Sequence, residues 1–188
     1  MKNIKTLNKI VITASLIAIA VGWRIINHNY SIAPNLELVT VVSVIAAITM
    51  GIRFGLIVPL TTIILSDLII GNTSIFIFTW SAFALIGISA TLLKKLNNKP
   101  RNQILASVGF AAVSSFSFFV ITNFGVWAQG WYPATMAGLV DCYVAAIPFY
   151  RTMLIGNLIL VPAAVSVWQL VRVYQTNKES VVDTLVRQ

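Results

Sequence analysis

Charged residues make up only 10% of this 188-residue chain, and just five of them are acidic. Hydrophobic residues make up 58%, whereas a soluble domain is about half apolar and about one quarter charged. A chain with so few charges cannot cover a water-facing surface, so the composition excludes a soluble protein. We expect an integral membrane protein with lipid as its main surroundings.

Cysteine and histidine occur only once each, as Cys142 and His28. A single cysteine excludes an intramolecular disulfide and any metal site built on paired cysteines. A single histidine likewise excludes a site with several imidazole ligands. Cys142 is then either a packing residue or a lone ligand, and a mixed metal site of His28 with Glu37, Asp67 or Cys142 is a minor alternative. We expect no resident cofactor.

Long apolar runs are abundant, and none shows the alternation with period two that a barrel strand needs. A spanning helix needs about 20 mostly apolar residues. The pattern therefore predicts an all-α, polytopic bundle in a single transmembrane domain, residues 1–188. Its six predicted helices cover about 10–26, 36–52, 54–70, 75–93, 104–122 and 152–174.

The stretch 135–147 is apolar but too short to span a membrane. Pro148 follows it, and a proline inside a helix removes a hydrogen bond and clashes with the preceding turn. The sequence therefore predicts a short separate helix in the outer leaflet, ended by Pro148.

Basic residues have a strongly uneven distribution along the six-helix topology. With the N-terminus inside, only Arg24 and Arg151 of the 13 Lys and Arg residues fall on the outer side. Positive residues favour cytoplasmic loops, so the net charge of +8 indicates topology and not a nucleic-acid partner. We predict a multi-pass protein of the bacterial cytoplasmic membrane with both termini inside.

The connection after the first predicted helix is rich in hydrogen-bonding side chains. His28, Asn29, Tyr30 and Asn35 precede Glu37 at the start of the second helix. One interpretation is a loop that closes over a polar ligand. The alternative is a solvated connection in which Asn35 caps the next helix.

Asp67 lies near the outer end of the third predicted helix, a few residues before Asn72. A carboxylate at this depth is costly unless it is paired or lines a wet cavity. Arg24 and Arg151 are its predicted partners. A structural ion pair and a ligand-binding acid both remain open.

Aromatic and polar side chains are densest between the fifth and sixth predicted helices. Rings beside a few polar groups are typical of a ligand site, although an interfacial aromatic belt is the competing explanation. The candidate binding residues of this stretch are Asn123, Trp127, Trp131, Tyr132, Asp141, Tyr143 and Arg151.

The first predicted helix carries Ala14, Ala18 and Gly22 at four-residue spacing. This spacing places three small side chains on one stripe, where another helix can approach closely. The stripe either packs within the bundle or docks a partner subunit.

Several stretches of the chain resemble an uncharacterised family of small bacterial membrane proteins. They are 35–71, with Arg53-Phe54-Gly55 and Leu65-Ser66-Asp67-Leu68-Ile69-Ile70-Gly71, then Thr122-Asn123-Phe124-Gly125-Val126-Trp127, Tyr132-Pro133, Gly138-Leu139, Cys142-Tyr143, Ala146-Ile147-Pro148-Phe149 and Leu154-Ile155-Gly156-Asn157. That family in turn resembles the S-components of energy-coupling-factor vitamin transporters. The likeness implies a six-helix bundle with an outer ligand pocket, and a transmembrane coupling subunit that contacts Ala14 and Ala18. Some proteins similar to S-components hold cobalamin through a cysteine, which makes Cys142 a cobalt ligand to consider.

These observations predict a membrane subunit that binds a small, ring-containing micronutrient and that is not itself an enzyme. The chain has no Gly-rich Lys-Ser/Thr phosphate loop, so energy would come from separate ATPases. Two alternatives are an intramembrane enzyme that uses Asp67 and Asp141, with Cys142 as nucleophile, and a structural or assembly subunit without a small ligand.

Overall fold

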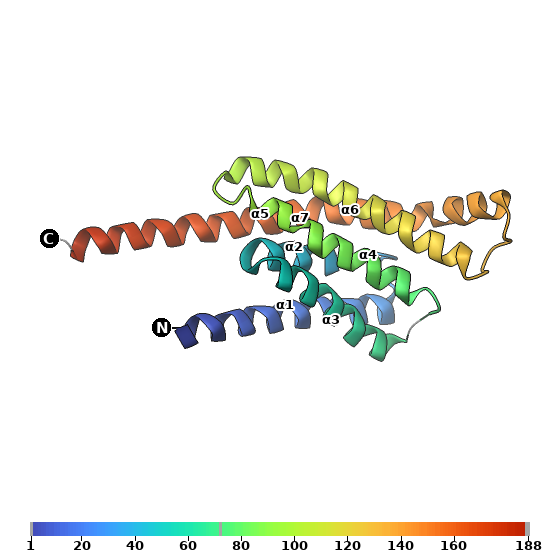
Figure 1. Cartoon of the computed structure of the whole chain (residues 1–188), viewed down its shortest axis with the longest axis horizontal. Helices are drawn as coiled ribbons and strands as arrows, with labels where there is room; N and C mark the ends of the chain where they lie inside the picture. The colour runs from blue at the N-terminus through green and yellow to red at the C-terminus, as the bar shows by residue number, and fades with distance from the viewer. Residues whose placement is uncertain (1, 72, 187–188) are drawn as a thin grey trace.

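The computed structural model describes residues 2–71 and 73–186, with side chains for 7–71 and 73–175, and these residues form only helices and their connections. The chain runs back and forth along one direction, and both of its ends lie at the same end of the bundle (Figure 1). The helices are α1 (Lys2–Tyr30), α2 (Val39–Met50), α3 (Ile52–Ile70), α4 (Phe76–Ser89), α5 (Thr91–Lys94), α6 (Pro100–Ala128) and α7 (Met136–Val186).

Five stretches of the described chain are long and apolar enough to cross a membrane: 7–30, 52–70, 76–94, 100–128 and 136–175. The third of these contains both α4 and α5. Isoleucine, leucine and valine side chains on α1, α6 and α7 are exposed, for example Ile19, Val113 and Ile159, as expected for surfaces that face lipid. The chain is built as a multi-pass membrane protein.

Helix α2 differs from the expected span at 36–52. With 12 residues it is about 18 Å long, shorter than the hydrocarbon core of about 30 Å. Its end is set by Gly51, whose φ of 95° is readily adopted only by glycine. Val39, Val44 and Ile48 are fully buried, because α1, α3, α4, α5 and α7 all contact α2. The short helix is therefore the centre of the bundle.

Helices α3 and α4 approach backbone to backbone at two glycines. A Cβ at Gly87 would overlap the carbonyl oxygen of Gly55. Small residues at a crossing point are the usual way in which membrane helices come this close.

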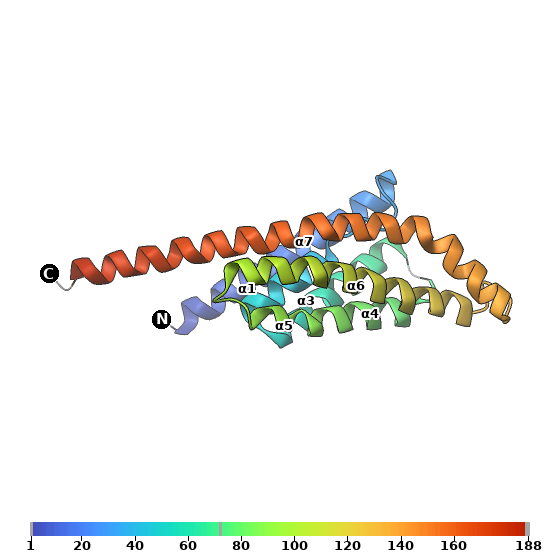
Figure 2. The same cartoon turned by 90° about the horizontal axis from the view of Figure 1, so that it is seen from above.

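The prediction of a short helix at 135–147, separate from one at 152–174, is wrong. Helix α7 runs without interruption from Met136 to Val186, with Pro148 and Pro162 inside it. Pro148 has no N–H to donate to the Val144 carbonyl, so one backbone bond of the helix is unmade. One turn later the Thr152 hydroxyl donates to the Pro148 carbonyl at 3.2 Å. An exposed helix break would leave many more groups unbonded in lipid. The N-terminal part of α7 is bent instead (Figure 2), as prolines inside helices cause.

Helices α1 and α6 also extend beyond the predicted ends. Residues 27–30 belong to α1, and Asn123 and Trp127 belong to α6, although the polar side chains suggested connections there. The Asn123 side chain bonds to the carbonyl of Phe119 one turn earlier, at 2.7 Å. Polar residues near the end of a span are thus compatible with a helix. The backbone N–H and C=O groups of a helix bond to one another even where the helix extends beyond the apolar layer.

Candidate functional site

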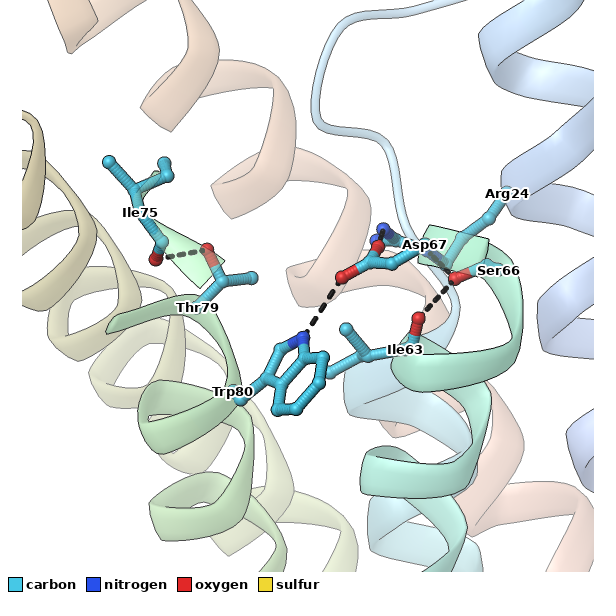
Figure 3. A network of polar contacts seen from close by, with 7 residues as sticks. All are labelled: Arg24, Ile63, Ser66, Asp67, Ile75, Thr79 and Trp80. Carbon is cyan, nitrogen blue, oxygen red and sulfur yellow. Dashed lines mark hydrogen bonds and ion pairs between the residues drawn. The ribbon is translucent and has the colours of Figure 1, made fainter. Parts of the chain in front are cut away.

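Arg24 connects three helices at the end of the bundle opposite the termini (Figure 3). Its Nε donates to the Ser66 hydroxyl at 2.6 Å, and its Nη2 lies 2.8 Å from Oδ1 of Asp67. The other carboxylate oxygen of Asp67 accepts a bond from Trp80 Nε1 at 2.9 Å. The prediction that Asp67 pairs with Arg24 or Arg151 is confirmed for Arg24, whereas Arg151 is exposed on α7.

The ion pair is well shielded from solvent, with side-chain exposures of 19% for Arg24 and 10% for Asp67. Removing water from two charges is costly unless each finds a partner and further hydrogen bonds. Ser66 and Trp80 supply those further bonds. The group therefore holds α1, α3 and α4 together and balances its own charge.

Glu37 forms a second buried network, in the connection between α1 and α2. Its Oε2 accepts the backbone N–H of Thr40 at 2.8 Å, and its Oε1 accepts the Thr40 hydroxyl at 2.5 Å. Asn157 of α7 donates to Glu37 Oε1 at 3.2 Å and to the Ser115 hydroxyl of α6 at 3.1 Å. One carboxylate thus links the start of α2 to α6 and α7.

The Glu37 side chain lies outside the spanning helices but is buried, and the residue is only 7% exposed. This burial raises the pKa of its carboxyl, while the bonds from Thr40 and Asn157 and the charge of Arg24 lower it. No lysine, arginine or histidine among the described residues lies within ion-pair distance of Glu37.

The connection 31–38 is folded onto the bundle by bonds from α1. Asn27 donates to the carbonyls of Ala33 and Leu36 and accepts from the N–H of Ala33, all at 2.9 to 3.0 Å. Trp23 Nε1 also donates to Leu36, at 2.9 Å. Asn35 has a φ of 60°, a left-handed conformation that asparagine tolerates. The alternative in which Asn35 caps the next helix is wrong, because Leu38 holds the cap position of α2.

Two adjoining cavities lie between these networks. The first has a volume of about 340 Å³ and the second of about 290 Å³, close to the lower bound of roughly 300 Å³ for small-molecule sites. Both are lined by Arg24, Asn35, Phe118 and Met153. The first also reaches His28, Glu37 and Phe83, and the second reaches Thr79, Thr122, Asn123, Phe119, Phe149 and Tyr150.

The candidate residues divide into two groups. His28, Asn35, Glu37 and Asn123 line the two cavities, and Asp67 contacts Arg24 and lines a separate lateral groove beside Trp80. Asn72 lies outside the described residues. Besides Asp67, the described candidates that line neither cavity are Asn29, Tyr30, Trp127, Trp131, Tyr132, Asp141, Tyr143 and Arg151.

Several residues outside the cavities have structural partners. Trp127 Nε1 donates to the Pro133 carbonyl at 3.0 Å, and Trp131 Nε1 donates to the Ser74 hydroxyl at 3.2 Å. The second of these bonds joins the connection after α6 to the connection after α3. The Tyr143 hydroxyl donates to the Val120 carbonyl at 2.7 Å and so joins α7 to α6. These rings brace the rim of the bundle.

Cys142 is buried in α7, and its thiol lies 3.4 Å from the carbonyl of Asn123. Within the described part of the chain, no three His, Cys, Asp or Glu side chains lie close enough to share a metal ion. The packing interpretation of Cys142 accounts for its surroundings.

Sequence reasoning missed several residues of the site. Asn157 and Ser115 are polar residues inside long apolar runs, a signal that singles out functional positions in membrane helices. Phe118 and Met153 carried no such signal, because an apolar side chain in an apolar run does not show which way it faces.

The small residues of α1 lie on the outside of the bundle. Ala14 and Ala18 are exposed, and a Cβ at Gly22 would meet no atom within 4 Å among the described residues. The interpretation in which this stripe packs inside the bundle is therefore wrong. Its neighbour, if it has one, is lipid or another chain.

Comparison with known proteins places these features in a family. A model described as a family of unknown function (DUF6580) matches residues 4–180. No curated protein and no solved structure matches the chain. The match covers α1 to α6 and most of α7, so the residues of both cavities fall within it. The chain belongs to this family of unknown function, DUF6580.

Proposed function

We propose that this protein is a substrate-binding membrane subunit that takes up a small, ring-containing micronutrient, such as a vitamin or its precursor. The observation that carries the proposal is the pair of adjoining cavities at the end of the bundle opposite the termini. If the termini are cytoplasmic, as the distribution of Lys and Arg predicts, the cavities lie at the outer face.

The lining supports a binding role over a purely structural one. Polar groups buried in a membrane bundle are costly and mark functional positions. Arg24 and Asn123 are partly buried, and they line the cavities together with the rings of Phe118, Phe119 and Tyr150. A mostly apolar cavity with a few polar groups is the usual form of a small-molecule site.

The outer stripe of α1 supports a partner subunit. Ala14, Ala18 and Gly22 form a smooth strip that other residues of the bundle leave uncovered, and small residues let membrane helices approach closely. The resemblance to S-components of energy-coupling-factor transporters adds a transmembrane coupling subunit and separate ATPases as the expected partners.

The binding proposal is tested on the full chain purified into lipid nanodiscs. Native mass spectrometry against a panel of vitamins and precursors should show one ligand per chain, and the same compound should raise the unfolding temperature. A panel that leaves both the mass and the unfolding temperature unchanged would count against a binding function and favour a structural subunit.

Docking is tested separately with the Ala14→Trp/Ala18→Trp double variant. Uptake into cells should fall to background while ligand binding in nanodiscs is retained, because a bulky ring prevents close helix approach. Ala163→Trp, at an exposed alanine of α7, is the matched control and should transport normally. Normal uptake by the double variant would remove the docking role.

A further inference from the structure

Charge around the two cavities is unevenly balanced. Lysine, arginine, aspartate and glutamate contribute two of the described lining residues, which are Arg24 and Glu37. The Arg24 charge is already matched by Asp67 at 2.8 Å, and Asp67 is further bonded to Trp80. This side of the first cavity is therefore neutral overall.

Glu37, in contrast, meets only neutral donors within the described structure. Thr40 supplies a backbone N–H and a hydroxyl, and Asn157 supplies an amide. These three bonds orient the carboxylate but bring no opposite charge. A buried carboxylate is costly in that state, and a cation in the adjoining cavity would stabilise its ionised form.

Aromatic rings complete the surroundings. Phe83 and Phe118 line the first cavity with their centroids 4.7 Å apart, and Phe119 and Tyr150 line the second with centroids 4.8 Å apart. The faces of aromatic rings attract cations and stack on planar groups. Aromatic rings and a carboxylate thus line the adjoining cavities, and both kinds of group favour a cationic ligand.

We infer, on the basis of the proposed binding function, that the ligand is an organic cation: a ring compound bearing a protonated amine, an amidine or a charged ring nitrogen, with its charge toward Glu37. An anionic ligand fits less well. It would have to compete with Asp67 for Arg24 and would bring a second negative charge beside Glu37.

Three probes of nearly equal shape test this inference. Benzamidine, benzamide and benzoate carry one positive charge, no charge and one negative charge on the same ring. Their affinities are measured by calorimetry on the full chain in nanodiscs near neutral pH. Benzamidine should bind about tenfold more tightly than benzamide, as one charge-assisted bond provides, and benzoate should bind least.

The Glu37→Gln variant assigns the preference to one residue. Glutamine keeps an acceptor for Thr40 but has no charge, so benzamidine should lose its advantage over benzamide. Glu179→Gln removes one charge near the C-terminal end of α7 and should leave the preference for benzamidine unchanged. Should Glu37→Gln fail to fold, the order of the three probes on the unmodified protein decides the matter alone.

Benzamide or benzoate binding as tightly as benzamidine would overturn the inference, and so would a folded Glu37→Gln variant that keeps the preference. Absence of binding by all three probes up to millimolar concentration would overturn it too. The proposed binding function is judged independently by the vitamin panel, where a neutral or anionic ligand would support binding while rejecting the cation.

Discussion

The two ends of the bundle both bury polar side chains, but with different chemistry. At the end that carries the termini, Gln103 donates to the Leu93 carbonyl at 2.7 Å and to Asn97, and Gln169 donates to Gln103 and to the Asn97 carbonyl. Arg172 also donates to the Asn97 carbonyl, in the connection between α5 and α6. At the other end, Arg24, Asp67 and Glu37 surround cavities.

The difference shows how each end uses its polar groups. Gln103 and Gln169 are almost fully buried and bond to one another and to backbone carbonyls, so they join α5, α6 and α7 without any need for a net charge. Charged groups at the cavity end require counter-charges, and no lysine, arginine or histidine among the described residues lies within ion-pair distance of Glu37. The amide end therefore closes the bundle by uncharged hydrogen bonds, and the proposed ligand binding belongs to the cavity end.

The largest expected effect is on stability at the cavity end. Arg24→Ala leaves Asp67 buried without its counter-charge, so the variant should lose about 3–5 kcal/mol of unfolding free energy, measured by thermal and chemical unfolding in detergent. Arg151→Ala, which removes an exposed arginine at the same end, should change stability little. Equal effects of the two variants would show that the Arg24–Asp67 pair is not structural.

A smaller effect is expected at the amide end. Gln103→Leu removes the side-chain bonds that Gln103 makes with Asn97, Gln169 and the Leu93 carbonyl, at a cost of about 1–3 kcal/mol. Its ligand affinity should equal that of the unmodified protein once both are compared well below their unfolding temperatures. Weakened binding by the folded variant would break the division of roles between the two ends.

The smallest expected effect is a pH dependence of benzamidine binding. Burial raises the pKa of Glu37, so the carboxyl takes up a proton as pH falls, and the protonated form attracts a cation less. Affinity should therefore rise with pH above the range in which an ordinary glutamate carboxyl ionises, and it should level off once Glu37 is fully ionised. Arg24 and Asp67, the other charged groups nearby, form their own pair.

The His28→Gln variant removes the histidine that lines the same cavity and leaves Glu37 in place. The rise in affinity should persist in His28→Gln and disappear when Glu37→Gln is added. A rise that persists in the double variant would show that Glu37 is not its source.

Sequence patterns predicted the helical character and the Arg24–Asp67 pair because both depend on strong local signals. Apolar runs identify spans by length and composition, and a carboxylate beside few possible cations has few choices of partner. The cavity lining was predicted only in part. His28, Asn35, Glu37 and Asn123 are polar and attract attention, whereas Phe118 and Met153 resemble any lipid-facing residue.

What the sequence determined by itself is a membrane protein of apolar helices, because a chain with so few charges has only lipid or its own interior in which to place its side chains. Tertiary structure decided the rest. The burial of α2 against five other helices let a segment too short to span become the centre. The need to satisfy backbone groups in lipid kept α7 continuous through Pro148. Folding also turned Ala14 and Ala18 outward and brought Glu37, Arg24 and Asn123 around adjoining cavities. These outcomes depend on which helix faces pack against one another. A uniformly apolar run contains no sequence signal for which of its faces is buried.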